Sequence, residues 1–343
     1  MKFLLFKLPF VQFFLICTLN VFTPFSALSA PVESTSDSSN IAKLSFERLS
    51  VALRELNFST SFVVVKNNQA EPYHWLHGIT KDITSGNQVE LEILALLNGP
   101  RRDILRIDNI VSYIEPEYVP YSIISSHISG PIPAIFGQDI SVLENNYHFV
   151  SVGKNRILGR IAQLIRIVPK DTHRFGYWVW LDQESGLLLK LAIIARKGQL
   201  LEQVQFTHLE ITNAVSEHLK QLQVTDLPKV VDVATKQGGT ELAWQVNWLP
   251  NGFKQIKSNI HRINTSNKTV EFMLFNDGLV DISVYVNPSK DKLRAIEFAN
   301  DGATLVLNKV INNVEVSVVG KIPVASAKKI VNSVRFIRDF GIP

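Results

Sequence analysis

Apolar and polar residues alternate with a period of two through most of the stretch from residue 59 to residue 211, which predicts β-strands. In the clearest run, Val89, Leu91 and Ile93 alternate with Glu90 and Glu92. Other apolar runs of strand length are Phe62–Val65, Ile161–Ile167, Phe175–Leu181, Leu187–Ile194 and Leu201–Ile211. Turn-forming residues separate the last three runs. The pattern predicts a large antiparallel sheet whose last three strands form a meander.

A helical period precedes these strands. Phe46, Leu49, Leu53 and Leu56 recur every three or four residues. This spacing predicts an amphipathic helix over residues 41–56 with one buried face.

Residues 110–140 show neither period. They contain four prolines, two glycines and several isolated isoleucines. The composition predicts a long loop or short helices that lie over the sheet, and segments of this length often form lids or binding elements.

A second unit follows a polar stretch at residues 213–240, which contains Pro228 and predicts an interdomain linker. Strands are predicted at Leu242–Trp248, Val270–Leu274, Val280–Val286, Ala303–Leu307 and Val314–Val318, with a closing helix at Ala327–Val334. The sequence therefore predicts a larger β-rich domain at residues 30–212 and a smaller α+β domain at residues 241–343.

The first 29 residues have the layout of a secretory signal peptide. Lys2 and Lys7 precede an apolar run, Leu8 to Phe22, that is too short for a good membrane span, and Ala27-Leu28-Ser29 supplies small residues for cleavage. Cys17, the one cysteine of the chain, lies in this run after Ile16, so it does not fit a lipidation site. We expect a soluble exported bacterial protein, located in the periplasm, without thiols after cleavage.

Charge and motifs exclude several classes of function. Loss of Lys2 and Lys7 lowers the formal net charge from +4 to +2, which does not favour nucleic acid as a partner. No nucleophile elbow, phosphate-binding loop, dinucleotide fingerprint or HExxH zinc motif occurs. His74 and His77 are three residues apart, but on a strand they face opposite sides, so we interpret them as partly buried histidines rather than as metal ligands.

Several predicted strands are apolar on both faces, so the second face of the sheet needs a cover. A packed helix inside a curved sheet satisfies this need, and so does an apolar hollow for a ligand beneath the 110–140 segment. The residues that we expect to line such a hollow are Phe62, Val64, Trp75, Tyr177, Val179, Leu189 and Leu191.

Two basic sets lie near this predicted sheet. Arg101, Arg102 and Arg106 form one set, and Lys154, Arg156, Arg160 and Arg166 form the other. They are either ordinary solvated surface or a rim that holds phosphate groups beside the apolar hollow. On the second interpretation, the ligand is a bacterial lipid with a phosphorylated headgroup, held by Arg101, Arg102, Arg156 and Arg160.

The chain resembles the RseB/MucB family of sigma-E regulatory proteins. The markers, in chain order, are Gly99-Pro100-Arg101-Arg102, Ser112–Pro116, Ser151–Gly153, Arg174–Asp182, Leu201–Gln203, Trp248–Phe253, Asp277-Gly278 and Ala327–Ile330. Each marker is short, but their collinear order covers nearly the whole chain after residue 29.

The resemblance implies a fold and a function. The larger domain would be a lipoprotein-carrier-like, unclosed antiparallel β-barrel with helices on its concave face, and the smaller domain α+β. Family members are not enzymes and need no cofactor. They bind the periplasmic domain of the anti-sigma factor RseA and shield it from the site-1 protease. Lipopolysaccharide or another envelope lipid displaces them.

The second domain is our candidate for contact with that partner. Trp244, Trp248, Phe272 and Phe275 are the candidate residues, although the first three also fit a core because they share the apolar face of their strands. Phe275 has the opposite parity and is the better surface candidate.

Alternative functions remain open from sequence: a periplasmic lipid or lipoprotein carrier that uses the same hollow, and a hydrolase with an unrecognised site. The oligomeric state, homo-oligomers included, is also left open.

Overall fold

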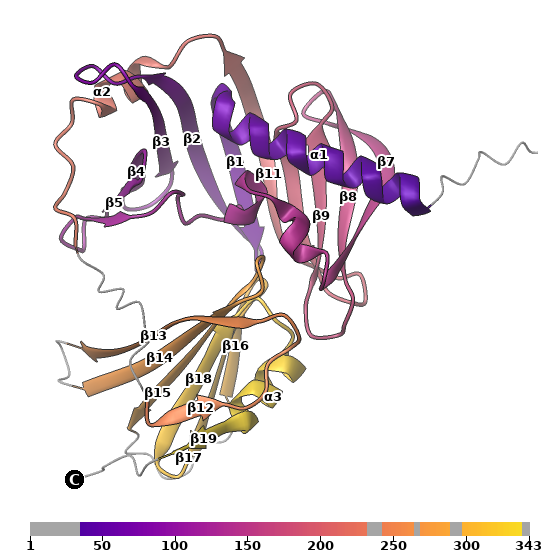
Figure 1. The fold of residues 1–343 in the computed structure, drawn as a ribbon, viewed down its shortest axis with the longest axis vertical. Coiled ribbons are helices and arrows are strands. Elements are labelled where there is room, and N and C mark those ends of the chain that lie inside the picture. The colour runs from indigo at the N-terminus through magenta and orange to yellow at the C-terminus, as the bar shows by residue number, and fades with distance from the viewer. Residues whose placement is uncertain (1–34, 232–241, 264–267, 289–296, 338–343) are drawn as a thin grey trace, which may run out of the picture. The chain divides into compact units, whose positions relative to one another are not determined.

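Eleven antiparallel strands form one large sheet in the computed structural model, which describes residues 35–231, 242–263, 268–288 and 297–337 (Figure 1). The signal-peptide prediction lies outside the described residues. The strand order is β6-β5-β4-β3-β2-β1-β11-β10-β9-β8-β7, so β6 and β7 are the two edge strands and do not pair with each other, and the sheet does not close. The antiparallel, unclosed barrel that the sequence and the resemblance predict is confirmed.

The strand bounds follow the predicted periodicity closely. The strands are β1 Asn57–Lys66, β2 Gln69–Lys81, β3 Gln88–Leu96, β4 Arg102–Ile107, β5 Ile110–Ile114, β6 Tyr121–Ile124, β7 Tyr147–Ile157, β8 Arg160–Pro169, β9 Gly176–Asp182, β10 Leu188–Ile194 and β11 Leu200–Thr212. Strands β9, β10 and β11 are consecutive neighbours, so the predicted meander is confirmed.

The predicted amphipathic helix is present as α1 (Thr35–Glu55) and begins earlier than expected. Ala42, Phe46 and Leu49 of its apolar face are fully buried. The ring of Phe46 contacts those of Phe136 and Phe149, with centroid distances of 5.3 and 5.7 Å. This helix therefore covers part of the second apolar face of the sheet, as one of the two alternatives from the sequence predicts.

The segment at 110–140 differs from the prediction because its first part belongs to the sheet. Strands β5 and β6 extend the sheet beyond β4, where Tyr113 stacks on Tyr121 at 5.2 Å. Aromatic cross-strand pairs of this kind stabilise short strands even where prolines interrupt the period. Only after β6 does the chain leave the sheet and form two 3-10 helices, η1 (Ala134–Gly137) and η2 (Ile140–Leu143).

The first part of the predicted linker is also structured. Helix α2 (Glu217–Leu222) begins at Ser216, whose hydroxyl accepts a hydrogen bond from the Leu219 amide. Val215, Leu219 and Leu222 pack against Leu76, Leu91 and Leu105 on the outer face of the sheet. Gly78 permits this approach, because a Cβ there would lie 3.0 Å from Leu219 Cδ1 and 3.1 Å from Val215 Cγ1.

The smaller unit contains a six-stranded antiparallel sheet in the order β13-β14-β15-β18-β17-β16 and a two-stranded pair, β12-β19. Its elements are β12 Trp244–Val246, β13 Lys254–Ile263, β14 Lys268–Asn276, β15 Asp281–Pro288, β16 Glu297–Asp301, β17 Thr304–Ile311, β18 Val314–Gly320, α3 Val324–Ser333 and β19 Val334–Phe336. Asn312 and Asn313 both have positive φ in the β17–β18 turn, as the Asn-Asn sequence favours. The predicted α+β character is confirmed.

Both sheets belong to one compact unit, within which buried polar groups join them. Arg174 Nε donates to Asp277 Oδ2 at 2.7 Å, and both side chains are fully buried. The hydroxyl of Tyr147 donates to the same carboxylate at 2.8 Å, and Arg174 also donates to the Asn251 carbonyl. A buried charge pair of this kind is costly to break, because each partner would leave the other uncompensated.

Candidate functional site

A cavity of about 570 Å³ opens on the concave face of the large sheet, beside α1. Its apolar lining comes from helix, sheet and the segment after β6: Leu53, Phe62, Trp75, Leu94, Ile128 and Ile132. Residues 126–138 supply much of the remaining wall. The concave face therefore carries both a packed helix and a hollow, rather than one of the two alternatives that the sequence left open.

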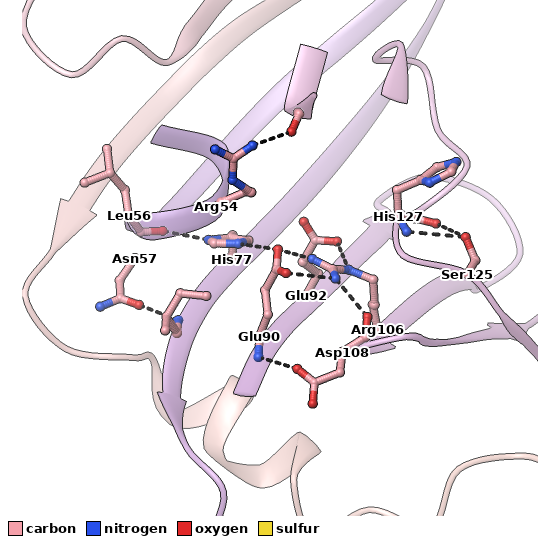
Figure 2. Close-up of polar contacts among 12 residues, drawn as sticks. Arg54, Leu56, Asn57, His77, Glu90, Glu92, Arg106, Asp108, Ser125 and His127 are labelled. Carbon is pink, nitrogen blue, oxygen red and sulfur yellow. Dashed lines mark hydrogen bonds and ion pairs between the residues drawn. The ribbon is translucent and has the colours of Figure 1, made fainter. Parts of the chain in front are cut away.

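Arg54 links the helix to the wall of this cavity. Its Nη1 donates to the Ser50 hydroxyl at 2.6 Å and to the Gly137 carbonyl at 2.9 Å, as the dashed contact from Arg54 in Figure 2 shows for the carbonyl. The carbonyl belongs to η1, so the end of α1 and the wall segment hold one another at the cavity's edge.

One end of the cavity is polar. His77 on β2, Glu90 and Glu92 on β3 and Arg106 on β4 form a charged cluster there, drawn in Figure 2. Glu90, Glu92 and Arg106 line the cavity itself. The side chains of His77, Arg106 and Glu92 are 0, 4 and 8% exposed, and that of Glu90 is 27% exposed.

The strand register builds the cluster directly. His77 of β2 pairs with Glu92 of β3, and Glu92 pairs with Arg106 of β4, so the three residues form one row across the sheet. Residues paired in this way have side chains on the same face at short range. The glutamates that alternate with Val89 and Leu91 therefore face the covered, concave side.

Arg106 is held by both carboxylates. Its Nε donates to Glu92 Oε2 at 2.7 Å, and its Nη1 donates to Glu90 Oε2 at 3.0 Å and to the Asp108 carbonyl at 2.9 Å. A further hydrogen bond runs from Nη2 to Glu90 Oε1. Burial alone would lower the pKa of Arg106, but the hydrogen bonds and charges of Glu90 and Glu92 outweigh it and raise that pKa.

The same hydrogen bonds lower the pKa of Glu90. Burial alone would raise it, but hydrogen bonds from His77 and Arg106 to the carboxylate outweigh the burial. Glu90 is therefore an ionised acceptor.

Both ring nitrogens of His77 face acceptors. Nδ1 lies 2.6 Å from the Leu56 carbonyl oxygen, and Nε2 lies 3.1 Å from Glu90 Oε1. A carbonyl oxygen can only accept, so Nδ1 donates to Leu56. His77 is thereby held between the residue that follows α1 and the carboxylate of Glu90.

Three residues of this cluster could in principle bind a metal ion. Within the described ranges, His77, Glu90 and Glu92 offer ligand atoms that all lie within 4.8 Å of one another. The guanidinium of Arg106 already bridges the two carboxylates, and the two ring nitrogens of His77 already contact the Leu56 carbonyl and Glu90. The arrangement therefore suits an internal ion-pair cluster better than a cation site.

The other histidine of the sequence pair, His74, lies on the opposite face of β2. Its Nδ1 is 3.1 Å from the Ser61 hydroxyl, and burial lowers its pKa. The prediction that His74 and His77 face opposite sides is confirmed.

The residues predicted to line an apolar hollow are distributed over several places. Phe62 and Trp75 line the 570 Å³ cavity. Val64 borders a cavity of about 420 Å³, and Tyr177 and Leu191 border one of about 930 Å³. Val179 is fully buried in the main core.

The structure corrects the prediction that Leu189 lines the apolar hollow. It packs with Trp180 and Ala192 in a separate cluster, whereas Leu188 and Leu191 belong to the main core. The pairing of β10 with β9 shifts register between Leu188 and Lys190. A β-bulge of this kind changes which residues face inward, and the period of two cannot reveal it.

The basic residues do not form one rim. Arg101 and Arg102 lie at the start of β4, whereas Arg156 and Arg160 lie on β7 and β8 at the other end of the sheet. Arg160 is already paired with Asp182 at 2.8 Å and Glu184 at 2.7 Å. The single phosphate-holding rim that combined these four arginines is therefore wrong. Of these four arginines, only Arg102 borders one of the cavities described above, the cavity of about 420 Å³.

The candidate partner residues of the smaller unit also differ from expectation. Phe275 is 3% exposed, so its assignment to the surface is wrong, because β14 buries Met273 and Phe275 rather than Phe272.

The other three candidates differ in how much of their surface is accessible. Trp244 is 1% exposed and donates to Glu271 at 2.9 Å. Half-buried Phe272 stacks on Tyr285, and Lys329 lies over the ring of half-buried Trp248. Phe272 and Trp248 thus retain accessible surface.

Sequence reasoning missed the charged cluster as a unit. The sequence places Arg106 in a basic set that is either solvated surface or a phosphate-holding rim, and Glu90 and Glu92 in the polar half of an alternating strand. One signal was present: Glu90, Glu92 and Arg106 alternate with apolar residues on neighbouring strands of a sheet that needed covers on both faces. The register that joins them to His77 could not be obtained from one strand alone.

Among the helices of the described residues, none combines the length and apolar character that a membrane crossing requires.

Two family models match the chain. The MucB/RseB N-terminal domain matches residues 42–231, and the MucB/RseB C-terminal domain matches residues 239–335. The sigma-E factor regulatory protein RseB of Haemophilus influenzae is 29% identical over 295 residues, which are 86% of this chain and 91% of that protein. The sigma factor AlgU regulatory protein MucB of Pseudomonas aeruginosa is 28% identical over 314 residues, 90% of this chain and 94% of that protein.

Solved structures agree in fold. A crystal structure of MucB in complex with MucA(peri) superposes with a TM-score of 0.67 at 28% identity, covering 87% of this chain and 99% of that chain. A structure of the Pseudomonas aeruginosa MucA/MucB complex gives the same TM-score and coverage at 26% identity.

Proposed function

Because the chain belongs to the MucB/RseB family, we propose that it regulates an envelope-stress sigma factor by binding the periplasmic domain of an RseA-type anti-sigma factor. The observation that carries this proposal is the match to both family domains, together with a fold similar to that of MucB crystallised with MucA(peri). Binding would shield the partner from the site-1 protease and would need no catalytic residue or cofactor. The site of action would be the periplasm, after removal of residues 1–29.

The second part of the proposal is release by a lipid. The cavity of about 570 Å³ has an apolar wall, a polar end and a wall segment at residues 126–138, which is the usual form of a site for an amphiphile. A lipid that binds only the partner-free protein lowers the apparent affinity for the partner by mass action.

A protease-protection assay tests both parts. The purified mature protein is incubated with the periplasmic domain of the anti-sigma factor and with the site-1 protease. Cleavage should slow as the protein is added in excess, and lipopolysaccharide should restore it. Cleavage at the unprotected rate at every concentration would refute the regulatory function, and protection that no envelope lipid reverses would refute the lipid part.

A periplasmic lipid or lipoprotein carrier is the second candidate, because the same cavity would suit transport. A carrier should move labelled lipid from donor to acceptor vesicles without the anti-sigma factor. A regulator should bind the lipid without accelerating its transfer.

A further inference from the structure

The outer face of strands β8, β9 and β10 carries two tryptophans and two cations in register. Arg166 of β8 pairs with Trp178 of β9, and Trp180 of β9 pairs with Lys190 of β10. Residues that alternate with them along the strands, such as Leu191, belong to the main core. Because successive side chains of a strand point to opposite faces, these four side chains lie on the face away from the core and from α1.

Each cation lies over one of the two indole rings. Arg166 Cζ is 5.4 Å from the centroid of Trp178, Lys190 Nζ is 4.9 Å from that of Trp180, and the two rings are 6.1 Å apart. Trp180 is nearly covered, but Trp178 is half-buried and Arg166 is exposed. Val150 of β7 pairs with Arg166 and is 37% exposed. These five residues form the outer patch, which combines aromatic and aliphatic surface with positive charge.

The carboxylates near this patch are already neutralised by other cations. Four carboxylates occur between residues 160 and 205, and each has a basic partner: Asp171 pairs with Arg174, Asp182 and Glu184 with Arg160, and Glu202 with Lys321.

Four cations of the same stretch have no carboxylate partner in the part of the chain that the structure describes. They are Arg166 and Lys190 of the outer patch, and the exposed Arg196 and Lys197 in the turn after β10. Burial lowers the pKa of Lys190, as expected for an ammonium group without a counter-charge. The region therefore has a surplus of positive charge that the protein itself does not offset.

The combination of these features fits a lipid surface better than a soluble polyanion. Tryptophan rings prefer the headgroup level of a bilayer, where one side is apolar and the other is wet. Lysines and arginines beside an anionic bilayer each add to the attraction. A nucleic acid would use the cations but would leave the apolar surface of Val150 in water.

We propose that the outer patch, together with Arg196 and Lys197, docks the protein on an anionic phospholipid surface. The cavity of about 570 Å³ opens on the concave face, so this contact leaves the cavity free. The inference goes beyond the proposed function and does not depend on it.

Flotation of the mature protein with vesicles tests the proposal. One kind of vesicle contains only phosphatidylcholine, and the other contains equal amounts of phosphatidylcholine and phosphatidylglycerol. At low salt the protein should bind the anionic vesicles at least about tenfold more tightly. The preference should shrink at about 0.5 M salt, because salt screens exposed charges.

Variants locate the contact on the protein. Arg196→Gln/Lys197→Gln removes two exposed cations without touching either indole ring, and it should bind anionic vesicles about thirtyfold more weakly. Lys81→Gln/Lys229→Gln is the matched control, since it removes the same charge from exposed positions outside β8, β9 and β10, and its binding should change by less than about threefold. Ile132→Trp, which narrows the cavity, should bind these vesicles as the unaltered protein does.

Tryptophan fluorescence tests contact with the lipid itself. Vesicles whose phosphatidylglycerol carries brominated acyl chains should quench part of the emission of the bound protein. Trp178→Phe should lose most of this quenching, because Trp178 is the accessible ring of the outer patch. Trp244→Phe should keep it, because Trp244 is 1% exposed.

Three results would overturn the proposal. The first is equal binding to the two kinds of vesicle, and the second is equal weakening by the turn variant and its control. The third is binding to heparin without binding to anionic vesicles, which would assign the cations to a soluble polyanion. If Ile132→Trp abolishes vesicle binding, the lipid contact lies in the cavity, so this proposal fails while the lipid part of the proposed function stands.

Discussion

His77 Nε2 lies 3.1 Å from Glu90 Oε1, while the other ring nitrogen of His77 lies 2.6 Å from the Leu56 carbonyl. The imidazole thereby joins the end of α1 to β3 through a ring that is 0% exposed. His77 and Arg106 thereby hold two glutamates of a concave, covered face in one hydrogen-bonded cluster beside an apolar cavity.

The first prediction concerns the hydrogen bond from this ring to the Leu56 carbonyl. Nitrogen NMR of the full protein should show a proton on Nδ1 of His77 that is protected from exchange with solvent, because the carbonyl can only accept and the ring is fully buried. His74, which is only half-buried, is the internal control and should exchange its ring proton faster. A His77 ring without a proton on Nδ1 would contradict the hydrogen-bond assignment.

The second prediction concerns Arg106. Arg106→Met should lower the free energy of unfolding by about 3–5 kcal/mol, because Glu90 and Glu92 would be left without their cation in a largely buried site. Urea unfolding measures the change. The matched control is Arg101→Met, where an exposed arginine pairs with Asp103, and the expected loss there is below about 1 kcal/mol. Equal losses at the two positions would show that the cluster has no special role in stability.

The third prediction concerns the contribution of Glu90 to the pH dependence of stability. Its pKa in the folded protein lies below the ordinary value of 4.5, so its contribution to stability is fully present above that pH and declines as the pH falls through the lower folded value. The difference in unfolding free energy between the unaltered protein and Glu90→Gln should therefore shrink as the pH is lowered below about 4.5. A difference that stays constant or grows on acidification would contradict the lowered pKa.

The fourth prediction concerns the cavity. Ile132→Trp should fill part of it and weaken binding of a neutral apolar fluorophore by about tenfold, with little loss of stability, because the added ring occupies space that no side chain fills. Ile124→Trp is the control, since Ile124 is 73% exposed on β6 and does not line the cavity. Unchanged binding by Ile132→Trp would place the fluorophore elsewhere.

The fifth prediction concerns the packing of α2 on the outer face. Gly78→Ala should destabilise the protein by about 1–3 kcal/mol, because the new methyl group would press on Leu219 and Val215. Gly137→Ala should be neutral or slightly stabilising, since nothing lies within 4 Å of a Cβ there. Thermal unfolding of both variants distinguishes this packing effect from a general cost of replacing glycine.

Much of the fold follows from local pattern. The period of two in β3 and the 3.6-residue period around Phe46 each depend on neighbours a few positions away, and both predictions hold in the structure. The same local logic failed at Leu189, where a bulge in β10 changes the inward-facing residues, and at β14, where Phe275 rather than Phe272 is buried. Parity within a strand gives two faces, but only the pairing of strands and what covers them decides which face is inside.

The sequence by itself determined the class of fold, the helix that covers the sheet, the family, and the need for a second cover over doubly apolar strands. It could do so because hydrophobic periodicity and short ordered motifs are properties of neighbouring residues. Tertiary structure alone decided that His77, Glu92 and Arg106 share one row, and that Glu92 and Arg106 line one end of an apolar cavity. Those relations depend on the register between strands and on the path of residues 126–138 across the concave face, which are set by the packing of the whole domain.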